Sequence, residues 1–266
     1  MSELDHSDDL AIAAAMADAA REAIRPYFRT ALDVDNKLGQ GFDPVTAADR
    51  ASEQAMRAIL GERAPEDGIL GEEFGEQAGR NRRRWVLDPI DGTRAFISGL
   101  PSWTVLIALE VSGRPQLGVI DQPHLGERFI GWPGGGRLER GAEIRSLKTR
   151  SGVSLADATL STTDPYLFDG AEAEAFAHLR RQARLCRFGY DAYAYAMLAL
   201  GGVDLVVESG LQAYDVQALI PVVEGAGGVV TNWRGGDASQ GGQIVAAASG
   251  DLLEETLAVL APAAES

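Results

Sequence analysis

The sequence predicts a layered fold of the α/β or α+β class, and three observations support this expectation. Segments with helical and with strand character are mixed in both halves of the chain. The length of 266 residues suits one large domain or two smaller halves that share a core. Hydrophobic residues make up 45% and charged residues 24% of the chain, which is typical of globular proteins and excludes disordered or collagen-like chains.

Two helices are expected near the start of the chain. Apolar residues recur at helical spacing in an alanine-rich run from Leu10 to Phe28. The segment 33–42 is polar and contains glycine, which predicts a mobile loop. Thr46 and Asp49 have the spacing of a capping box, so a second helix is expected from there to about Leu60.

A group of strands follows the second helix. The basic run Arg80–Arg84 precedes them, and we interpret it as a solvated loop rather than an anion site. Short apolar segments separated by turn residues then predict several strands and one hairpin. The predicted strands are Trp85–Asp88, Thr104–Val111, Leu117–Asp121 and Arg128–Trp132, and the predicted hairpin covers Leu138–Ile144.

The second half of the chain again mixes helices with strands. The most plausible seam between the two halves is the stretch 146–154. Beyond it, the patterns predict three helices and two strands, followed by two more strands and a final helix. These segments are the strand Thr159–Thr162, the helices Ala171–Arg184 and Ala192–Leu200, the strand Val203–Val207 and the helix Tyr214–Gly225.

Charge and cysteine content exclude several classes of function. The net charge is −15, so a surface for nucleic acid or anionic membranes would have to form against a repulsive field. The one cysteine, Cys186, cannot form an intrachain disulfide, which suits a reducing compartment. No secretory signal begins the sequence, and no apolar run approaches the ~20 residues of a membrane span. We therefore expect a soluble cytoplasmic protein without nucleic-acid or membrane partners.

Four acidic motifs stand out, and each of them alone has a structural explanation. Thr46–Asp49 is a helix cap, and Asp88–Thr93 (Asp-Pro-Ile-Asp-Gly-Thr) is rich in turn formers. Glu72 and Glu73 could be solvated surface residues. Asp215, ahead of an apolar helix, is a candidate N-cap.

The combination and order of these motifs is more specific than any one of them. DPVTAAD, GEE, WVLDPIDGT, and YD before a helix that ends in GAGG follow one another between Gly41 and Ala248. In this combination the sequence resembles the inositol monophosphatase family of metal-dependent phosphatases, with DPIDGT as its most specific part. The resemblance implies an α/β (α+β) layered αβαβα sandwich and a homodimer. It also implies one phosphatase unit over 1–266, in which a half of about 1–148 carries most metal ligands and a half of about 149–266 completes the site.

The chemistry of the motif residues agrees with this resemblance. The implied site would bring five carboxylates together, and the repulsion between each like-charged pair at ~4 Å costs about 1–4 kcal/mol. Such a cluster needs raised pKa values or bound cations. Because all candidate ligands are hard oxygens, Mg²⁺ or Mn²⁺ is favoured over zinc. The five carboxylates belong to Asp49, Glu72, Asp88, Asp91 and Asp215.

By resemblance, the metal ligands divide into two or three sites. Glu72, Asp88 and the backbone carbonyl of Ile90 would hold the first ion. The second would be held by Asp88, Asp91 and Asp215, and a third ion would contact Glu72. Two metal ions about 3.5–4 Å apart can stabilise a phosphoryl transfer, one ion at the attacking oxygen and the other at the leaving oxygen.

The resemblance also assigns roles around the phosphate. Gly92 and Thr93 would present backbone N–H groups to phosphate oxygens. Thr93, hydrogen-bonded to Asp49, would orient the nucleophilic water together with Glu72. The implied reaction is direct hydrolysis by in-line attack, without a phosphoenzyme.

Three passages look like the histidinol-phosphatase branch of the family: 88–101, 189–195 and 208–215. A carboxylate at Asp191 would suit histidinol phosphate, whose leaving group carries an ammonium and an imidazole, since charge-assisted hydrogen bonds are the stronger ones. Its structural alternative is an N-cap on the following helix. Glu208 matches a position that contacts the leaving alcohol.

Arg94 could contact the phosphate or pair with a carboxylate. Another small monoester, chiefly inositol phosphate, is the alternative substrate. A catalytically silent binding or regulatory module is the alternative from another class, although every expected metal ligand is present in the sequence.

Overall fold

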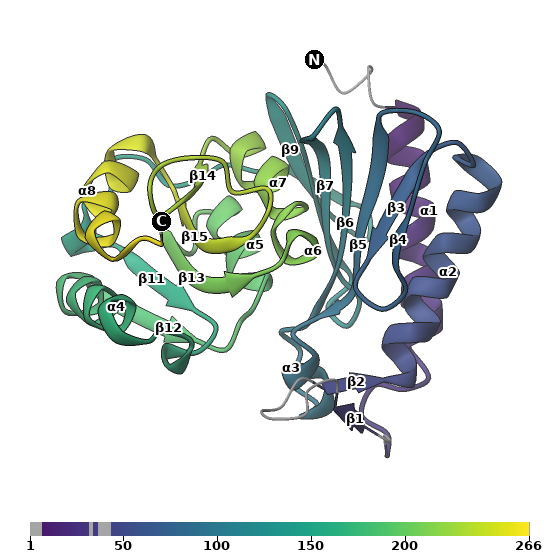
Figure 1. Ribbon diagram of the computed structural model, residues 1–266, viewed down its shortest axis with the longest axis horizontal. Coiled ribbons are helices and arrows are strands. Elements are labelled where there is room, and N and C mark those ends of the chain that lie inside the picture. Colours follow the sequence, from purple (N-terminus) through teal and green to yellow (C-terminus); the bar gives the residue numbers. More distant parts are fainter. Residues whose placement is uncertain (1–6, 32–33, 37–43, 266) are drawn as a thin grey trace.

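Two β-sheets, one in each half of the chain, organise the protein (Figure 1). The computed structural model describes residues 7–31, 34–36 and 44–265. The first sheet is the larger one and has eight strands, which are β3 (Gly68–Gly71), β4 (Gly75–Gln77), β5 (Arg83–Asp91), β6 (Thr104–Val111), β7 (Arg114–Gln122), β8 (Glu127–Trp132), β9 (Gly135–Arg140) and β10 (Glu143–Ser146). The second contains β11 (Thr159–Thr162), β12 (Leu185–Phe188), β13 (Leu205–Leu211), β14 (Val229–Asn232) and β15 (Gly242–Ala247).

The two sheets differ in strand direction. The large sheet has the order β10-β9-β8-β7-β6-β5-β3-β4 and is antiparallel except for the parallel pair β3–β5. The small sheet has the order β12-β11-β13-β15-β14. In it β12, β11 and β13 are parallel, whereas β15 runs antiparallel to both of its neighbours.

Helices form three layers around the sheets (Figure 1). On the outer face of the large sheet lie α1 (Ser7–Ile24) and α2 (Ala47–Arg63). The outer layer of the small sheet consists of α4 (Gly170–Gln182) and α8 (Gly250–Leu260). Between the sheets lie α5 (Tyr193–Ala199), α6 (Ala213–Val216) and α7 (Leu219–Gly225). The predicted αβαβα sandwich is therefore confirmed.

Strand β6 shows how the large sheet joins two cores. Its side chains alternate between the faces of the sheet, as the period of a strand requires. Val105, Ile107 and Leu109 pack into the cluster under α1 and α2. Leu106 and Ala108 pack into the cluster that includes α5 and α7. Both faces are buried, and this explains the nearly continuous apolar sequence of β6.

Two glycines let the middle layer lie close to the large sheet. A Cβ atom at Gly118 of β7 would clash with the carbonyl oxygen of Ala218. A Cβ at Gly131 of β8 would clash with the carbonyl oxygen of Pro221 in α7. The absence of side chains at these positions sets the spacing between α7 and the sheet.

The predicted helices near the start are present with shifted bounds. The first begins at Ser7 and ends at Ile24 instead of Phe28, with turns after it. Thr46 is the N-cap of α2 and forms the expected capping box with Asp49. Within the predicted loop at 33–42, residues 34–36 form β1 (Val34–Asn36), which pairs with β2 (Pro44–Thr46). The remainder of that loop lies outside the described residues.

The interpretation of the basic run 80–84 as a solvated loop is wrong for its second part. Arg83 and Arg84 begin β5 and are only partly exposed. Arg83 pairs with Asp67 at 3.1 Å, and Arg84 pairs with Glu110 at 2.7 Å. Acidic partners on neighbouring segments allow these arginines to enter the sheet.

The helix predicted at 214–225 is divided into α6 and α7. Pro221 has no N–H to donate to the carbonyl of Gln217, and its ring would clash with that carbonyl in a continuous helix. The chain therefore restarts as α7 at Leu219. Strands β3, β4 and β12 are not among the predicted elements, because they are three or four residues long and contain only one β-branched residue between them.

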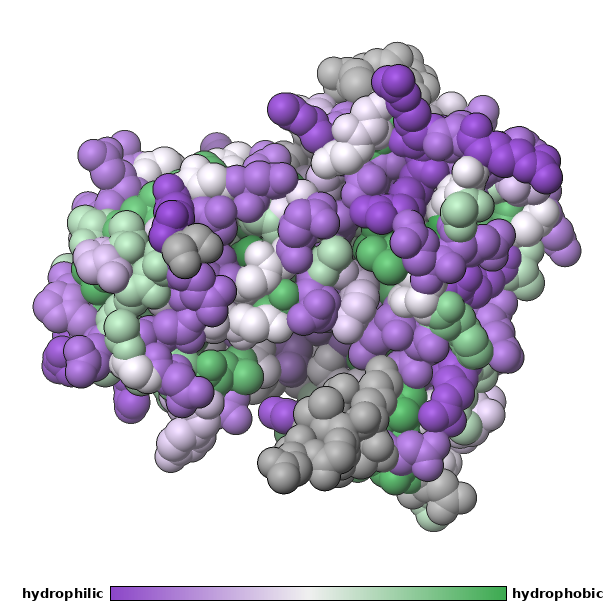
Figure 2. All heavy atoms as spheres, viewed as in Figure 1, coloured by the Kyte–Doolittle hydropathy of each residue, from purple (hydrophilic) through white to green (hydrophobic). Residues whose placement is uncertain are grey.

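The surface in Figure 2 is mostly hydrophilic over both halves, with apolar side chains in small separate groups. Among the described residues, we find no helix that combines the length and the apolar character needed to cross a membrane.

Candidate active site

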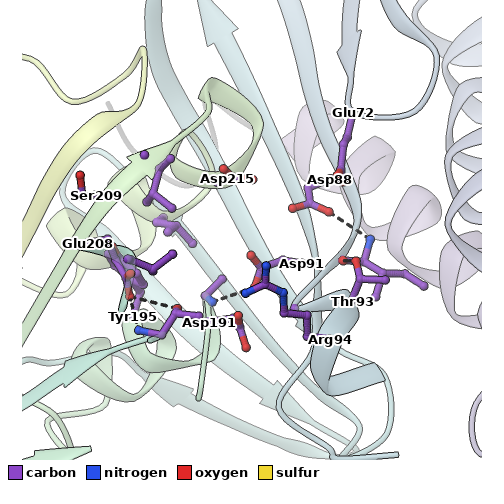
Figure 3. A pocket seen from close by; sticks show the side chains of 18 residues that line it. Glu72, Asp88, Asp91, Thr93, Arg94, Asp191, Tyr195, Glu208, Ser209 and Asp215 are labelled. Atoms are coloured by element: carbon purple, nitrogen blue, oxygen red, sulfur yellow. Dashed lines mark hydrogen bonds between the residues drawn. The ribbon is translucent and has the colours of Figure 1, made fainter. Parts of the chain in front are cut away.

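A cavity of about 250 Å³ lies between the two halves of the chain (Figure 3). One side is formed by the residue after β3, the end of β5 and the start of α3 (Thr93–Ile97). The other side is formed by residues of β13, α5 and α6 and by the segment after β11. All predicted metal and substrate residues line this cavity, and Asp49 lies behind it. The lining residues predicted from the sequence are Glu72, Asp88, Ile90, Asp91, Gly92, Thr93, Arg94, Asp191, Glu208 and Asp215.

An irregularity in β5 brings two carboxylates to the cavity. The pairing of β5 with β6 shifts register between Asp88 and Asp91, with Pro89 in the interval. Such a bulge redirects side chains that a regular strand would send to fixed faces. The backbone N–H of Ile90 donates to the Asp88 carboxylate at 3.0 Å, which fixes its orientation.

A third carboxylate joins them from the other half of the chain. Oxygen atoms of Asp88, Asp91 and Asp215 lie within 4.8 Å of one another. Asp215 is the third residue of α6, and it accepts from the backbone N–H of Gln212 at 2.6 Å. The N-cap of α6 is Gln212, so the structural alternative of Asp215 as an N-cap is wrong. The three oxygens have the spacing and chemistry that suit a hard divalent cation.

The electrostatics of the cluster favour a bound cation. Burial raises the pKa of Asp88 well above its usual range, and the charges of Glu72, Asp91 and Asp215 raise it further. Burial likewise raises the pKa of Asp91, although the backbone N–H of Ala192 opposes the shift. In the protein alone, protons must relieve the repulsion, whereas a divalent cation would replace them.

Thr93 and Asp49 lie next to this cluster. Asp49 is buried and accepts from the backbone N–H and the hydroxyl of Thr46 at 2.8 and 2.6 Å. The Thr93 hydroxyl is 3.5 Å from the Asp49 carboxylate and donates to the Ile90 carbonyl at 3.0 Å. The expected contact between Thr93 and Asp49 is therefore present, but it is the longer of the two.

Asp191 faces the cluster from the other half. Its backbone is left-handed, with φ 47°, and Gly92 opposite it has φ 77°. Burial raises the pKa of Asp191 to about 6, against the effect of the Arg94 charge. The N-cap of α5 is Ala192, without a side-chain hydrogen bond, so the structural alternative of Asp191 as a helix cap is wrong. The N–H of Ala192 donates instead to Asp91 at 2.7 Å, which links the start of α5 to the cluster of carboxylates.

The model of the inositol monophosphatase family matches residues 5–265. The chain belongs to this family. It is a phosphoric monoester hydrolase of a metal-dependent family that acts on small phosphate monoesters.

Individual family members are similar over most of the chain. A histidinol-phosphatase of Mycobacterium tuberculosis is 38% identical over 254 residues, which are 94% of this chain and 96% of the relative. A bifunctional chloroplast phosphatase of Arabidopsis thaliana is 46% identical over 85% of this chain, but the match spans only 64% of that protein. The structure of an inositol monophosphatase from Zymomonas mobilis superposes with a TM-score of 0.85 at 43% identity, covering 98% of this chain and all of that one.

The side chain of Glu208 is buried and is fixed by hydrogen bonds, which its sequence did not predict. It is 1% exposed, and the N–H and hydroxyl of Thr163 donate to it at 2.8 and 3.1 Å. Burial raises its pKa to about 8. Tyr195, Thr163 and Ser209 also line the cavity. Sequence reasoning assigned no role to these three, and the alternation of Tyr193 and Tyr195 with alanines in one passage is the signal that could have indicated the tyrosine.

Proposed function

We propose that the protein hydrolyses L-histidinol phosphate to L-histidinol and phosphate, a step of histidine biosynthesis. The observation that carries this proposal is the acidic wall on the C-terminal side of the cavity (Figure 3). Asp191 and Glu208 both line that wall, outside the cluster of Asp88, Asp91 and Asp215. A leaving group with an ammonium and an imidazole finds acceptors there, and inositol would bring only neutral hydroxyls.

The cation that we propose is Mg²⁺, in two or three sites, with Mn²⁺ as a substitute. Glu72, Asp88 and the Ile90 carbonyl would hold one ion, Asp88, Asp91 and Asp215 the second, and Glu72 the third. The Ile90 carbonyl already accepts from Thr93, but a carbonyl oxygen has a second lone pair. When bound, such ions polarise phosphate oxygens and lower the pKa of a bound water.

The side chains on the N-terminal side would then orient the reacting groups. Thr93 directs its hydroxyl proton to the Ile90 carbonyl, so its oxygen can accept a hydrogen bond from the attacking water. Glu72 would accept a hydrogen bond from the same water. The carboxylate of Asp49, 3.5 Å from the Thr93 hydroxyl, would help to hold Thr93 in place. The N–H groups of Gly92 and Thr93 would bind the phosphate. This arrangement suits in-line attack on the phosphorus with direct release of the alcohol.

Arg94 is next to the acidic wall and lowers the pKa of Asp191. We propose that it binds the phosphate of the substrate and leaves the Asp191 carboxylate to the ammonium of the leaving group. The 38% identity with a histidinol-phosphatase over nearly the whole chain supports the same substrate.

The test is phosphate release from L-histidinol phosphate and from inositol 1-phosphate, each with Mg²⁺ and with excess EDTA. We expect release that needs Mg²⁺ and a higher kcat/KM for histidinol phosphate. A preference for inositol 1-phosphate would refute the proposed substrate but leave the metal site intact. Release that is unaffected by EDTA would refute the metal assignment.

Inositol 1-phosphate is the second candidate substrate. The 43% identity with the inositol monophosphatase from Zymomonas mobilis favours it. The Arg94 charge beside Asp191 favours it as well, since a partly compensated carboxylate can accept from neutral hydroxyls. The same side-by-side assay separates the two candidates.

We further infer how the chain is organised in the cell. Residues 1–266 would act as one phosphatase unit, because carboxylates from both halves meet at one site. In this proposal each half, at about 1–148 and about 149–266, would contain one of the two sheets. We also propose that the protein is a homodimer, which light scattering of the purified protein would test. We propose in addition that it acts in the cytoplasm.

A further inference from the structure

Four hydroxyl side chains line the cavity, and three of them already donate to acceptors of the protein. The hydroxyl of Tyr195 is buried and has no hydrogen-bond partner among the described residues. Buried polar groups are rarely left without a partner, so this hydroxyl calls for an explanation. The three donating hydroxyls are those of Thr93 to Ile90 at 3.0 Å, Thr163 to Glu208 at 3.1 Å and Ser209 to Glu172 at 3.0 Å.

The surroundings of Tyr195 keep its proton in place. The residue is 1% exposed and lies on α5, next to the cavity (Figure 3). Burial raises the pKa of the phenol well above its usual range, and the charges of Glu208, Asp91 and Asp215 raise it further. At neutral pH the group is a neutral phenol that can donate one hydrogen bond.

Tyr193, on the same helix, shows the contrast. Its hydroxyl donates to the Glu127 carboxylate at 2.7 Å, away from the cavity. Helix α5 therefore carries one tyrosine whose hydroxyl has a fixed partner in the protein and one that lines the cavity without such a partner among the described residues. A purely structural pair of tyrosines would be expected to have both hydroxyls satisfied within the fold.

We propose that Tyr195 is a specificity-determining residue whose phenol donates a hydrogen bond to an acceptor atom of the leaving alcohol. This inference rests on the proposed phosphatase function and adds the feature that the alcohol must present. Asp191 and Glu208 offer the substrate oxygen acceptors, whereas a ring nitrogen with a free lone pair, or a hydroxyl oxygen, needs a donor. A site that would leave its buried donor unpaired discriminates against alcohols without an acceptor.

The experiment compares wild type, Tyr195→Phe and the control Tyr193→Phe on three esters. These are L-histidinol phosphate, inositol 1-phosphate and phenyl phosphate, whose aromatic ring carries no acceptor. For the faster of the first two esters, we expect Tyr195→Phe to lower kcat/KM about tenfold, the effect of one lost hydrogen bond. On phenyl phosphate, Tyr195→Phe should match wild type, and Tyr193→Phe should match wild type on all three esters.

Thermal unfolding without substrate separates a structural role from recognition. Tyr195→Phe should keep or raise the Tm because it removes an unpartnered buried hydroxyl, whereas Tyr193→Phe should lower it by removing the bond to Glu127. Equal losses on all esters, or no loss on any, would overturn the role of Tyr195. If wild type prefers inositol 1-phosphate, the substrate proposal fails while the comparison with phenyl phosphate still decides Tyr195. Hydrolysis of phenyl phosphate alone would refute both.

Discussion

The side chain of Asp191 packs directly against the backbone of Gly92, although the two residues belong to different halves of the chain. A Cβ atom at Gly92 would lie 3.0 Å from an oxygen of Asp191 and 3.1 Å from its carboxyl carbon. The φ of 77° at Gly92 is itself a conformation that side chains disfavour. One glycine therefore fixes both the turn after Asp88 and Asp91 and the space for the Asp191 carboxylate of the acidic wall.

Gly92→Ala should lower kcat/KM strongly while the protein stays folded. The left-handed backbone costs about 1–2 kcal/mol with a Cβ, and the new methyl group would displace Asp191. We expect kcat/KM for the preferred ester to fall about a hundredfold, with Mg²⁺ titrations and Tm measured in parallel. Gly99→Ala is the matched control, since φ is 71° there and the nearest side-chain atom is 3.5 Å away. Similar activity loss in both variants would show that backbone strain, and not the contact with Asp191, is responsible.

Asp191→Asn removes a charge while it keeps the shape of the side chain. We expect kcat/KM for histidinol phosphate to fall about tenfold or more, and inositol 1-phosphate hydrolysis to change little, because only the cationic alcohol depends on the charge. Steady-state kinetics on both esters at saturating Mg²⁺ measure the difference. If both substrates lose activity equally, Asp191 supports the turn at Gly92 and does not select the substrate.

Much of the cavity lining could be predicted because its proposed metal ligands lie in short, specific motifs. DPIDGT places Asp88, Asp91 and Thr93 within six residues, and β5 then carries both carboxylates to the cavity. The bulge that redirects them depends on pairing with β6, which the local sequence does not encode. That Tyr195 lines the cavity was likewise not predictable, because its position depends on the direction in which α5 leaves the turn at Asp191.

The fold could be predicted where strands are long and buried. Thr104–Val111 has the predicted bounds because both faces of β6 are apolar. The edge strand β12 has alternating exposure and only four residues, so its pairing with β11 supplies what its sequence does not. The break between α6 and α7 follows from Pro221, a signal that was present in the sequence but was outweighed by the apolar run around it.

Asp88→Asn should abolish metal-dependent hydrolysis while the fold survives. The variant loses a carboxylate that two proposed ions would share, so we expect kcat to fall by at least about a thousandfold. It also removes an ionisable carboxyl from a buried cluster of like-charged groups, so the Tm in EDTA should equal or exceed that of wild type. Circular dichroism and thermal scans with and without Mg²⁺ test both statements. Retained activity would refute the assignment of Asp88 as a ligand.

The stability of the metal-free protein should fall as pH rises, and Glu208 is one cause. Its folded pKa of about 8 lies above the unfolded value of 4.5. Its contribution to stability is therefore full below pH 4.5 and is lost as pH rises through 8. Glu208→Gln cannot ionise, so in EDTA its Tm should decline less than that of wild type between pH 5 and pH 8, by about 5 °C. Parallel curves for the two proteins would show that Glu208 keeps the same charge in the folded and unfolded states.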